Sequence, residues 1–229
     1  MTITTCIFDA YGTLFDISAA AREAAAEPGR VALAACWQKL AADWRTKQLQ
    51  YTWHRALVRE HREFWLVTQD GLDWALENNG LAGDGDLRDR LLKLYWELTA
   101  YPEVPAMLAN LKDMGMNTAI LSNGSPAMLE GAVTSAGLNE VLDDTLSVEE
   151  VGVFKPAPEV YELVTRRFEC PPRHVLFVSS NCWDALAARG YRFQAVWVNR
   201  AGEPLDRLGH TPRETLSDLA GIPDLAKEF

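Results

Sequence analysis

Asp9 follows an apolar run in the segment IFDAYGTLFD, residues 7–16, and Tyr11 stands two positions after it. A carboxylate at the end of a buried strand can serve as a nucleophile or as a ligand to a cation. A metal-dependent phosphoryl-transfer site built on this pattern would carry a second carboxylate at the position of Tyr11. Because a phenol ordinarily has a pKa of about 10, Tyr11 cannot protonate a leaving group near neutral pH as a carboxylic acid would. The segment therefore raises the question of which reaction an aspartate at a strand end can perform with a tyrosine in that position.

Further polar side chains follow other apolar segments of the chain. They are Thr13, Ser122, Asn123, Lys155, Ser179, Ser180, Asn181 and Asp184. A serine or asparagine at a turn is by itself most often a cap or a turn former. Together with Asp9, however, this set would bring two carboxylates, a lysine and several short hydrogen-bonding groups to one crevice. Their joint placement predicts a site of acid–base and nucleophilic chemistry.

Alternating strands and helices are predicted to position these groups. Residues 3–8, ITTCIF, read as a strand that ends at Asp9, and four later strands lie in MNTAILS, VLDDTLSV, HVLFVSSN and QAVWVNR. Helices are predicted between them in VPAMLANLKDMG, AMLEGAVTSAGL, PAPEVYELVTRRF and CWDALAARGY. This alternation predicts an α/β fold with a doubly wound, Rossmann-like parallel sheet covered on both faces. Functional groups then belong at the carboxyl ends of the strands.

A helical block of about 80 residues separates the first strand from the others. Bulky side chains, among them Trp37 and Trp44, recur there at helical intervals, and EPGR at 27–30 breaks the pattern. A second helical stretch spans about 63–79, and Asp84 or Asp86 is a plausible cap for a third helix. The carboxyl-terminal tail is predicted to be rich in turns and then helical, packing back on the core.

Composition excludes several classes of function. The chain has 22 basic and 32 acidic residues, a net charge of -10, and phosphate binding along a nucleic acid requires a basic stripe instead. No run of about 18 apolar residues indicates a membrane span, so we expect a soluble cytoplasmic protein. The four cysteines lack the spacing of a zinc site or of a disulfide framework and are expected to be buried, reduced thiols.

Four ordered motifs, FDAYGTLFD, LSNGSP, KPAPEVY and VSSNCWDA, resemble the successive motifs of the haloacid dehalogenase superfamily. The amino-acid sequences of these motifs are most similar to those of the L-2-haloacid dehalogenases. The helical block lies where that family carries a helical cap, and WRTKQLQYTW resembles the cap segment that supplies an arginine. The resemblance thus implies an α/β core domain over residues 1–16 and 99–229 and an inserted helical-bundle cap over residues 17–98.

The chain departs from the phosphatases of this superfamily at two places. Their general acid/base aspartate is replaced by Tyr11, and their paired acidic residues in the last motif are reduced to Asp184 in SSNCWD. Magnesium prefers several carboxylate and phosphate oxygens, so we expect neither a metal nor another cofactor. A metal-dependent phosphatase remains the alternative enzyme. A nonenzymatic binding protein on a decayed scaffold is disfavoured by the intact Asp9, Lys155 and Asp184.

The resemblance implies hydrolysis of short-chain (S)-2-haloacids to (R)-2-hydroxyacids and halide. Asp9 would form an aspartyl ester, and Asp184 would activate the water that hydrolyses it, with Ser179 and Asn181 placing that water. Lys155 would orient Asp9 and keep it ionised. The family also implies a small-molecule 2-haloalkanoate as the partner, together with a homodimer, and neither a nucleic acid nor a membrane.

Other residues match family positions that bind the substrate. Arg45 resembles the arginine that stabilises the departing halide, with Asn123 as its amide partner, whereas helix charge patterns alone would also let Arg45 pair with Asp43 or Glu63. The remaining matches are the backbone amides near Ala10 and Tyr11 with Ser122 for the substrate carboxylate, and Thr13, Tyr161 and Trp183. Taken alone, Tyr161 and Trp183 are more often core aromatics. Asp184 taken alone is a favourable residue at a helix N-terminus.

Overall fold

A parallel sheet forms the centre of the molecule in the computed structural model, which describes residues 2–229. Within these residues the strands pair in the order β3-β2-β1-β4-β5-β6, and every neighbouring pair is parallel. The strands are β1 (Thr5–Phe8), β2 (Asn117–Ser122), β3 (Asp144–Ser147), β4 (Val175–Ser179), β5 (Gln194–Val198) and β6 (Glu214–Leu216). The predicted doubly wound α/β fold is confirmed.

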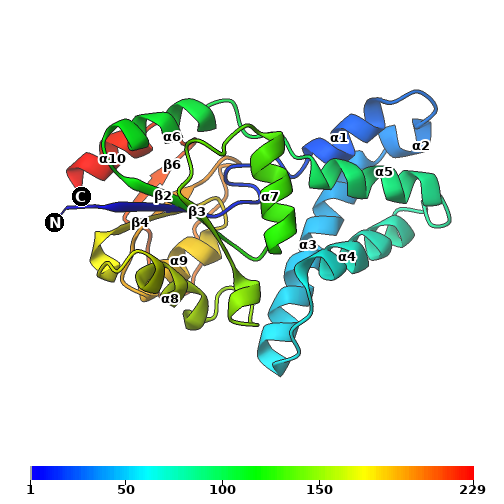
Figure 1. The fold of residues 1–229 in the computed structure, drawn as a ribbon. Helices are drawn as coiled ribbons and strands as arrows, with labels where there is room; N and C mark the ends of the chain where they lie inside the picture. Colours follow the sequence, from blue (N-terminus) through cyan, green and yellow to red (C-terminus); the bar gives the residue numbers. More distant parts are fainter. Residues whose placement is uncertain (1) are drawn as a thin grey trace.

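Helices cover both faces of the sheet because its central strands are apolar on both sides. Every residue of β1, β4 and β5 is buried. This is the pattern of a strand in a sheet whose two faces are both covered by helices. In Figure 1, α6 and α10 lie on one side of the sheet, and α8 and α9 lie on the other. The bounds are α6 (Val104–Asp113), α7 (Pro126–Ser135), α8 (Pro158–Arg167), α9 (Cys182–Gly190) and α10 (Ile222–Glu228), with short 3-10 turns η1 (Val148–Glu150) and η2 (Pro172–His174).

The sixth strand was not predicted from the sequence. β6 is short and largely exposed, so it has neither the apolar run nor the alternation that marks a strand. Backbone pairing holds it against β5: Arg213 N donates to Ala195 O at 2.7 Å, and Asn199 N donates to Leu216 O at 2.7 Å. The predicted helix at the end of the tail is confirmed as α10, whose Ile222 side chain is buried.

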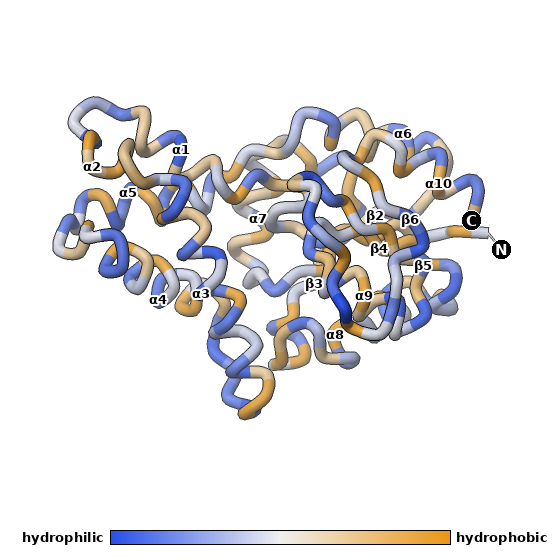
Figure 2. The backbone as a smooth tube through the Cα atoms, turned by 180° about the vertical axis from the view of Figure 1, so that it is seen from behind, coloured by the Kyte–Doolittle hydropathy of each residue, from blue (hydrophilic) through white to orange (hydrophobic). Residues whose placement is uncertain are grey.

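The other helices form a separate group to the right of the sheet in Figure 1. They are α1 (Ala19–Ala26), α2 (Val31–Ala34), α3 (Trp37–Val58), α4 (Phe64–Asn78) and α5 (Gly85–Trp96). In Figure 2 hydrophobic and hydrophilic residues alternate along α3 and α4, as expected of helices with one buried side. The predicted break at EPGR is present, because α1 ends just before Glu27. The predicted cap at Asp84 is also present, since Leu87 N donates to Asp84 Oδ1 at 2.9 Å.

Two linkers carry the chain out of the sheet and back beside each other. Phe15 and Ala100 form an antiparallel bridge, and Tyr101 N donates to Leu14 O at 2.9 Å. Arg200 holds both linkers, because its Nη2 donates to Thr13 O at 3.2 Å and its guanidinium lies 3.7 Å from the centre of the Tyr101 ring. We propose to divide the chain here, into a core of residues 1–16 and 99–229 and a cap of residues 17–98. Met1, the first residue of that core, lies outside the described residues.

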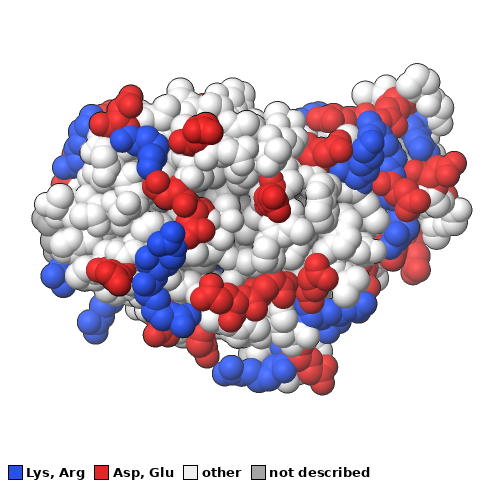
Figure 3. Space-filling view, viewed as in Figure 1, with Lys and Arg blue, Asp and Glu red and all other residues white. Residues whose placement is uncertain are grey.

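The surface and the cysteines follow the composition. On the face drawn in Figure 3, acidic and basic side chains are interspersed and form no continuous basic stripe. The four cysteines are unpaired within residues 2–229; Cys6 and Cys182 are buried, whereas Cys36 and Cys170 are only partly buried, so the expectation of burial is met by two of them. No helix of the described chain combines the length and hydropathy of a membrane span.

Candidate active site

The predicted polar residues gather where the strand order reverses, at the carboxyl ends of β1, β2 and β4. β1 lies between β2 and β4, with Phe8 in register with both Ile120 and Val178. Asp9 comes directly after β1, and its amide donates to Val178 O at 2.9 Å. Crevices at such a switch point are the usual ligand sites of open α/β sheets. The topology therefore brings to one place residues separated by more than a hundred positions in sequence.

Asp9 is oriented by three donors. Lys155 Nζ lies 3.1 Å from Asp9 Oδ1, while the Thr13 hydroxyl at 3.0 Å and Asn181 Nδ2 at 2.9 Å contact Asp9 Oδ2. Only 6% of Asp9 is exposed. A carboxylate held by charged and neutral donors on both oxygens keeps a fixed direction. This arrangement suits a nucleophile.

Lys155 also joins Asp9 to the second carboxylate, Asp184. Its Nζ lies 2.8 Å from Asp184 Oδ2, and the Tyr161 hydroxyl donates to Asp184 Oδ1 at 2.7 Å. Burial alone would lower the pKa of Lys155, but the charges of Asp184 and Asp9 outweigh burial and raise it above its usual value. The ammonium therefore stays charged and offsets the cost of burying two carboxylates.

Burial raises the pKa of Asp184 above its ordinary value of 3.8, with a further contribution from the negative charge of Asp9. Lys155 and the hydrogen bond from Tyr161 oppose that rise. A carboxylate that is less acidic than usual is a better proton acceptor. Each Asp184 oxygen retains a lone pair beyond the hydrogen bond it accepts. Asp184 lies in the first turn of α9. It is therefore both a residue at a helix N-terminus and a member of the site.

The loop after β4 organises Thr13 and Asn181. Ser180 N donates to the Thr13 hydroxyl oxygen at 2.8 Å, and the Ser180 hydroxyl lies 3.1 Å from the same atom. Ser179 is fully buried, and its hydroxyl accepts from Asn181 N at 3.1 Å. Ser179 thus shapes the loop that presents Asn181. Ser180 was predicted to lie among these polar groups but was assigned no role in the reaction.

Arg45 extends from α3 to the loops of the core. Its Nη2 donates to Tyr11 O at 3.3 Å and to Asn181 Oδ1 at 3.2 Å. The alternative pairing with Asp43 is wrong, because the Asp43 carboxylate instead accepts from Lys39 at 2.6 Å. The helical group thereby delivers a guanidinium to the residue that contacts Asp9.

Asn123 and Ser122 are buried beside this centre but have other partners. The Asn123 side-chain oxygen accepts from Lys155 N at 2.9 Å, and the Ser122 hydroxyl accepts from Gly124 N at 3.0 Å. The amide that contacts Arg45 is that of Asn181, whereas Asn123 was expected in this place. Asn123 therefore positions the backbone of Lys155.

The turn after Asp9 offers backbone donors. Ala10 and Tyr11 are both buried, and within residues 2–229 neither of their amides donates a hydrogen bond. The Tyr11 ring stacks on Tyr95 at 5.6 Å between centroids and lies 6.0 Å from Phe64. Burial, then the charges of Tyr95 and Asp9, raise the pKa of Tyr11 well above its usual value. Tyr11 is therefore a neutral phenol between core and cap and cannot act as the missing acid.

Gly124 is required by the position of Tyr11. A methyl group added at Gly124 would lie 2.8 Å from Tyr11 Cε2 and 3.1 Å from its hydroxyl oxygen. We expect Gly124→Ala to lower the free energy of unfolding by about 1–3 kcal/mol, the usual cost of overpacking, as measured by urea denaturation. Gly85→Ala is the control, because its added methyl group meets no atom within 4 Å. Equal stability of the two variants would contradict this role of Gly124.

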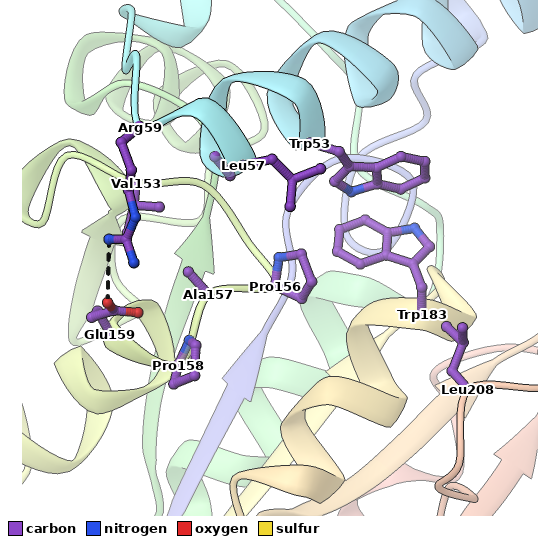
Figure 4. A pocket seen from close by; sticks show the side chains of 11 residues that line it. Trp53, Leu57, Arg59, Val153, Pro156, Ala157, Pro158, Glu159, Trp183 and Leu208 are labelled. Carbon is purple, nitrogen blue, oxygen red and sulfur yellow. Dashed lines mark ion pairs between the residues drawn. The ribbon is translucent and has the colours of Figure 1, made fainter.

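Two hollows flank the site. A cleft of about 600 Å³ between α3 and the core is lined by Arg45, Ser180 and Asn181, and the amide of Asn181 contacts Asp9. A larger apolar groove, of about 790 Å³, lies at the end of α3, and neither Asp9 nor Asp184 is among the residues that line it (Figure 4). Trp183 and Trp53 meet edge to face there, with ring centroids 5.5 Å apart. Trp183 is thus a wall residue of the apolar groove.

Sequence reasoning missed residues that support Arg45 from the cap. Gln48 and Tyr95 are buried and polar, and Gln48 Oε1 accepts from Arg45 Nη1 at 2.9 Å. The only signal was that a glutamine occupies the inner side of an amphipathic helix one turn after Arg45. Within the described chain, no group of three or more His, Cys, Asp or Glu residues is arranged to hold a metal ion.

Comparisons with known proteins identify relatives of this chain. The family model described as haloacid dehalogenase-like hydrolase matches residues 3–191. (S)-2-haloacid dehalogenase 1 of Pseudomonas sp. (strain CBS-3) is 42% identical, over 97% of this chain and 96% of its own length. (S)-2-haloacid dehalogenase 4A of Burkholderia cepacia is 40% identical, over 88% and 85%.

Among solved structures, a dehalogenase with an intermediate complex superposes with a TM-score of 0.93 at 36% identity, covering 99% of this chain and 98% of the other. The L-2-haloacid dehalogenase from Xanthobacter autotrophicus with chloropropionic acid covalently bound superposes with a TM-score of 0.88 at 33% identity, covering 98% of each chain. Fold and sequence identity agree over nearly the whole length. The chain belongs to the haloacid dehalogenase-like hydrolases and, within them, to the (S)-2-haloacid dehalogenase family.

Proposed function

We propose that the protein hydrolyses short-chain (S)-2-haloacids to (R)-2-hydroxyacids and halide. The observation that carries this proposal is the Asp9 carboxylate, held by Lys155, Thr13 and Asn181 next to the guanidinium of Arg45. A substrate with a negative carboxylate and a halide leaving group needs positive charge but no proton donor. Tyr11, which is buried and neutral, leaves the site without an acid at the usual position.

In the first step, an Asp9 oxygen attacks the carbon that bears the halogen from the side opposite to it. The new C–O bond forms as the carbon–halogen bond breaks, and the halide leaves with the bonding electrons. Configuration at this carbon inverts, which converts the (S) centre to (R). The product of the step is an ester between Asp9 and the 2-hydroxyacid.

Positive charge and free donors serve the two anionic ends of the reaction. Arg45 stabilises the departing halide, with Asn123 as a further polar group of the pocket, because donors aimed at developing charge lower the barrier. The unengaged amides of Ala10 and Tyr11, together with Ser122, bind the substrate carboxylate. Trp183 lines the neighbouring apolar groove and is assigned no contact with the substrate in this step.

In the second step, water attacks the carbonyl carbon of the Asp9 ester. Asp184 accepts the proton of that water, and Ser179 and Asn181 shape the loop that places it. As the tetrahedral intermediate collapses, its C–O bond to the 2-hydroxyacid breaks and Asp184 returns the proton to the departing oxygen, which releases the hydroxyacid. The proton left on the regenerated Asp9 carboxyl passes to water. Lys155, which bonds both carboxylates, holds the base and the ester in one geometry.

Tyr161 tunes the base in this scheme. Its hydroxyl donates to Asp184 and lowers the pKa of that carboxyl against the effect of burial. Tyr161→Phe removes this donor, so the pKa of Asp184 rises and the acidic limb of the kcat profile moves to higher pH. Tyr191→Phe is the control, because Tyr191 lies beside Tyr161 and its hydroxyl faces Thr165. Superimposable pH profiles for the parent and Tyr161→Phe would exclude this role.

The function is tested by halide release from each enantiomer of 2-chloropropionate in the presence of EDTA. We expect release from the (S) enantiomer and formation of (R)-lactate. Magnesium-dependent hydrolysis of p-nitrophenyl phosphate without halide release would instead identify a phosphatase of the same superfamily. Binding of carboxylates without any turnover would identify a nonenzymatic protein. Either of these results would overturn the proposal.

We also propose a cytoplasmic homodimer. The unpaired cysteines support a reducing compartment, and the exposed apolar side chains of Leu57 and Val58 at the end of α3 offer a contact surface. Light scattering coupled to size-exclusion chromatography measures the mass in solution. A mass of one chain, 25.5 kDa, at micromolar concentration would rule out the dimer.

A further inference from the structure

Gln48 is a buried amide in contact with the guanidinium of Arg45. It lies on α3 one turn after Arg45, and only 1% of it is exposed. Its Oε1 accepts from Arg45 Nη1 at 2.9 Å, and its Nε2 donates to the Thr68 hydroxyl oxygen at 2.8 Å and to the Tyr95 hydroxyl oxygen at 3.0 Å. A buried amide with every polar atom engaged is held rigidly.

The orientation of this amide follows from counting protons. The Thr68 hydroxyl has one proton and donates it to Phe64 O at 2.8 Å. Toward Gln48 the Thr68 oxygen can therefore only accept, which places the NH2 group of Gln48 on that side. The carbonyl oxygen of the same amide must then face Arg45. The hydrogen bond within α4 thus decides which atom Arg45 meets.

Close packing of α3 and α4 maintains this arrangement. A methyl group added at Gly71 would lie 3.2 Å from Gln48 N, so the two helices approach closely only because a glycine stands there. Trp44 Nε1 donates to Thr68 O at 2.8 Å one turn before Gln48. The amide is therefore fixed by the cap itself and not by the loops of the core.

All three hydrogen bonds that Arg45 makes within residues 2–229 go to uncharged acceptors, namely Gln48 Oε1, Tyr11 O and Asn181 Oδ1. A carboxylate in any of these places would form an ion pair with the guanidinium and offset its charge. A neutral acceptor directs the side chain without that loss. The positive charge of Arg45 consequently remains available to an anion in the cleft.

We propose that Gln48 is a positioning residue that aims Arg45 across the cleft while leaving its charge free for the anionic substrate and the departing halide. The inference rests on the proposed function, in which Arg45 meets these anions. It adds a requirement that the cap must satisfy: an acceptor at position 48 that is both buried and neutral.

A double-mutant cycle tests whether Gln48 acts through Arg45. Gln48→Met removes the acceptor and keeps the shape of the side chain, and Arg45→Met removes the group it aims. We expect Gln48→Met to lower kcat/KM for (S)-2-chloropropionate about 10- to 100-fold in the parent protein, and less than about 2-fold in the Arg45→Met background. Equal losses in the two backgrounds would show a merely structural role and overturn the proposal.

A charge test uses Gln48→Glu, which keeps size and shape and adds a carboxylate. We expect it to weaken the binding of propionate, a carboxylate without a leaving group, by about 10-fold or more, because the new charge pairs with Arg45. Gln50→Glu is the matched control, since Gln50 is exposed on the same helix and accepts from Lys47 at 3.0 Å. The control is expected to bind propionate as the parent does.

Calorimetric titration with propionate keeps this test separate from turnover, and thermal denaturation shows that each variant is folded. If the parent binds propionate but releases no halide from 2-chloropropionate, the proposed function fails, and the Gln48 proposal is still decided by the binding data. If Gln48→Glu and Gln50→Glu bind propionate equally, the Gln48 proposal fails alone. Absence of propionate binding by the parent would overturn the Gln48 proposal, whereas halide release alone decides the proposed function.

Discussion

Replacing Asp9 with alanine is expected to lower kcat for (S)-2-chloropropionate by about 10⁴-fold or more, because the group that forms the covalent bond is lost. Three donors surround the Asp9 carboxylate, and none of them is itself a nucleophile in the proposed reaction. Halide release under saturating substrate measures the effect. Asp113→Ala, at an exposed aspartate at the end of α6, is the control and should retain the parental rate.

Isotope labelling distinguishes loss of a nucleophile from loss of a positioning group. In a single turnover in H2-18O, water attacks the carbonyl carbon of the Asp9 ester, so the label is expected in Asp9. The first hydroxyacid molecule then carries an unlabelled oxygen from Asp9. Label in the first product with none in Asp9 would contradict the covalent mechanism.

Replacing Lys155 with methionine is expected to affect both activity and stability. The ammonium bonds Asp9 at 3.1 Å and Asp184 at 2.8 Å, and Asp184 is completely buried. Breaking a buried ion pair on one side leaves uncompensated charge, which costs about 3–5 kcal/mol of unfolding free energy. Without this cation the two carboxylates repel each other, and we expect kcat to fall about 10³-fold or more. Urea denaturation and halide release measure the two effects.

The pH dependence of this loss has a definite sign. Removing Lys155 takes away the main influence that lowers the pKa of Asp184, so that pKa rises further above 3.8, the value expected in the unfolded chain. A folded state whose carboxyl has a raised pKa binds more protons than the unfolded state. The free energy of unfolding therefore falls as the pH rises from the unfolded pKa of Asp184 to its higher folded pKa. The deficit of Lys155→Met should therefore be larger at about pH 8 than at about pH 5.

Lys112→Met provides the matched control for Lys155→Met. Lys112 pairs with Asp143 at the surface, where one third of each side chain is exposed. Such pairs contribute about 0–1 kcal/mol because water screens both charges. A deficit of similar size in both variants, or one independent of pH for Lys155→Met, would show that Lys155 does not hold the two buried carboxylates.

Most of the fold was predictable because its signals are local. Apolar runs marked five of the six strands within the described residues, and helical spacing with breakers marked the main helices. β6 escaped because backbone pairing with β5, and not its own side chains, makes it a strand. The convergence of Asp9, Lys155 and Asp184 was predictable as well, since carboxyl ends of parallel strands meet at one edge of the sheet.

The sequence by itself predicted Asp9 as the nucleophile, Lys155 as its partner and Asp184 as the base, from their places near strand ends together with the family resemblance. Only the tertiary structure decided which side chains meet across the cap and the core. Asn181 contacts Arg45 where Asn123 was expected, and Gln48 supports Arg45 from within the cap. These contacts depend on how α3 packs on α4 and on the direction of single hydrogen bonds. No periodicity or motif encodes them, because they depend on residues distant in sequence, such as Asn181 for Arg45 and Thr68 for Gln48.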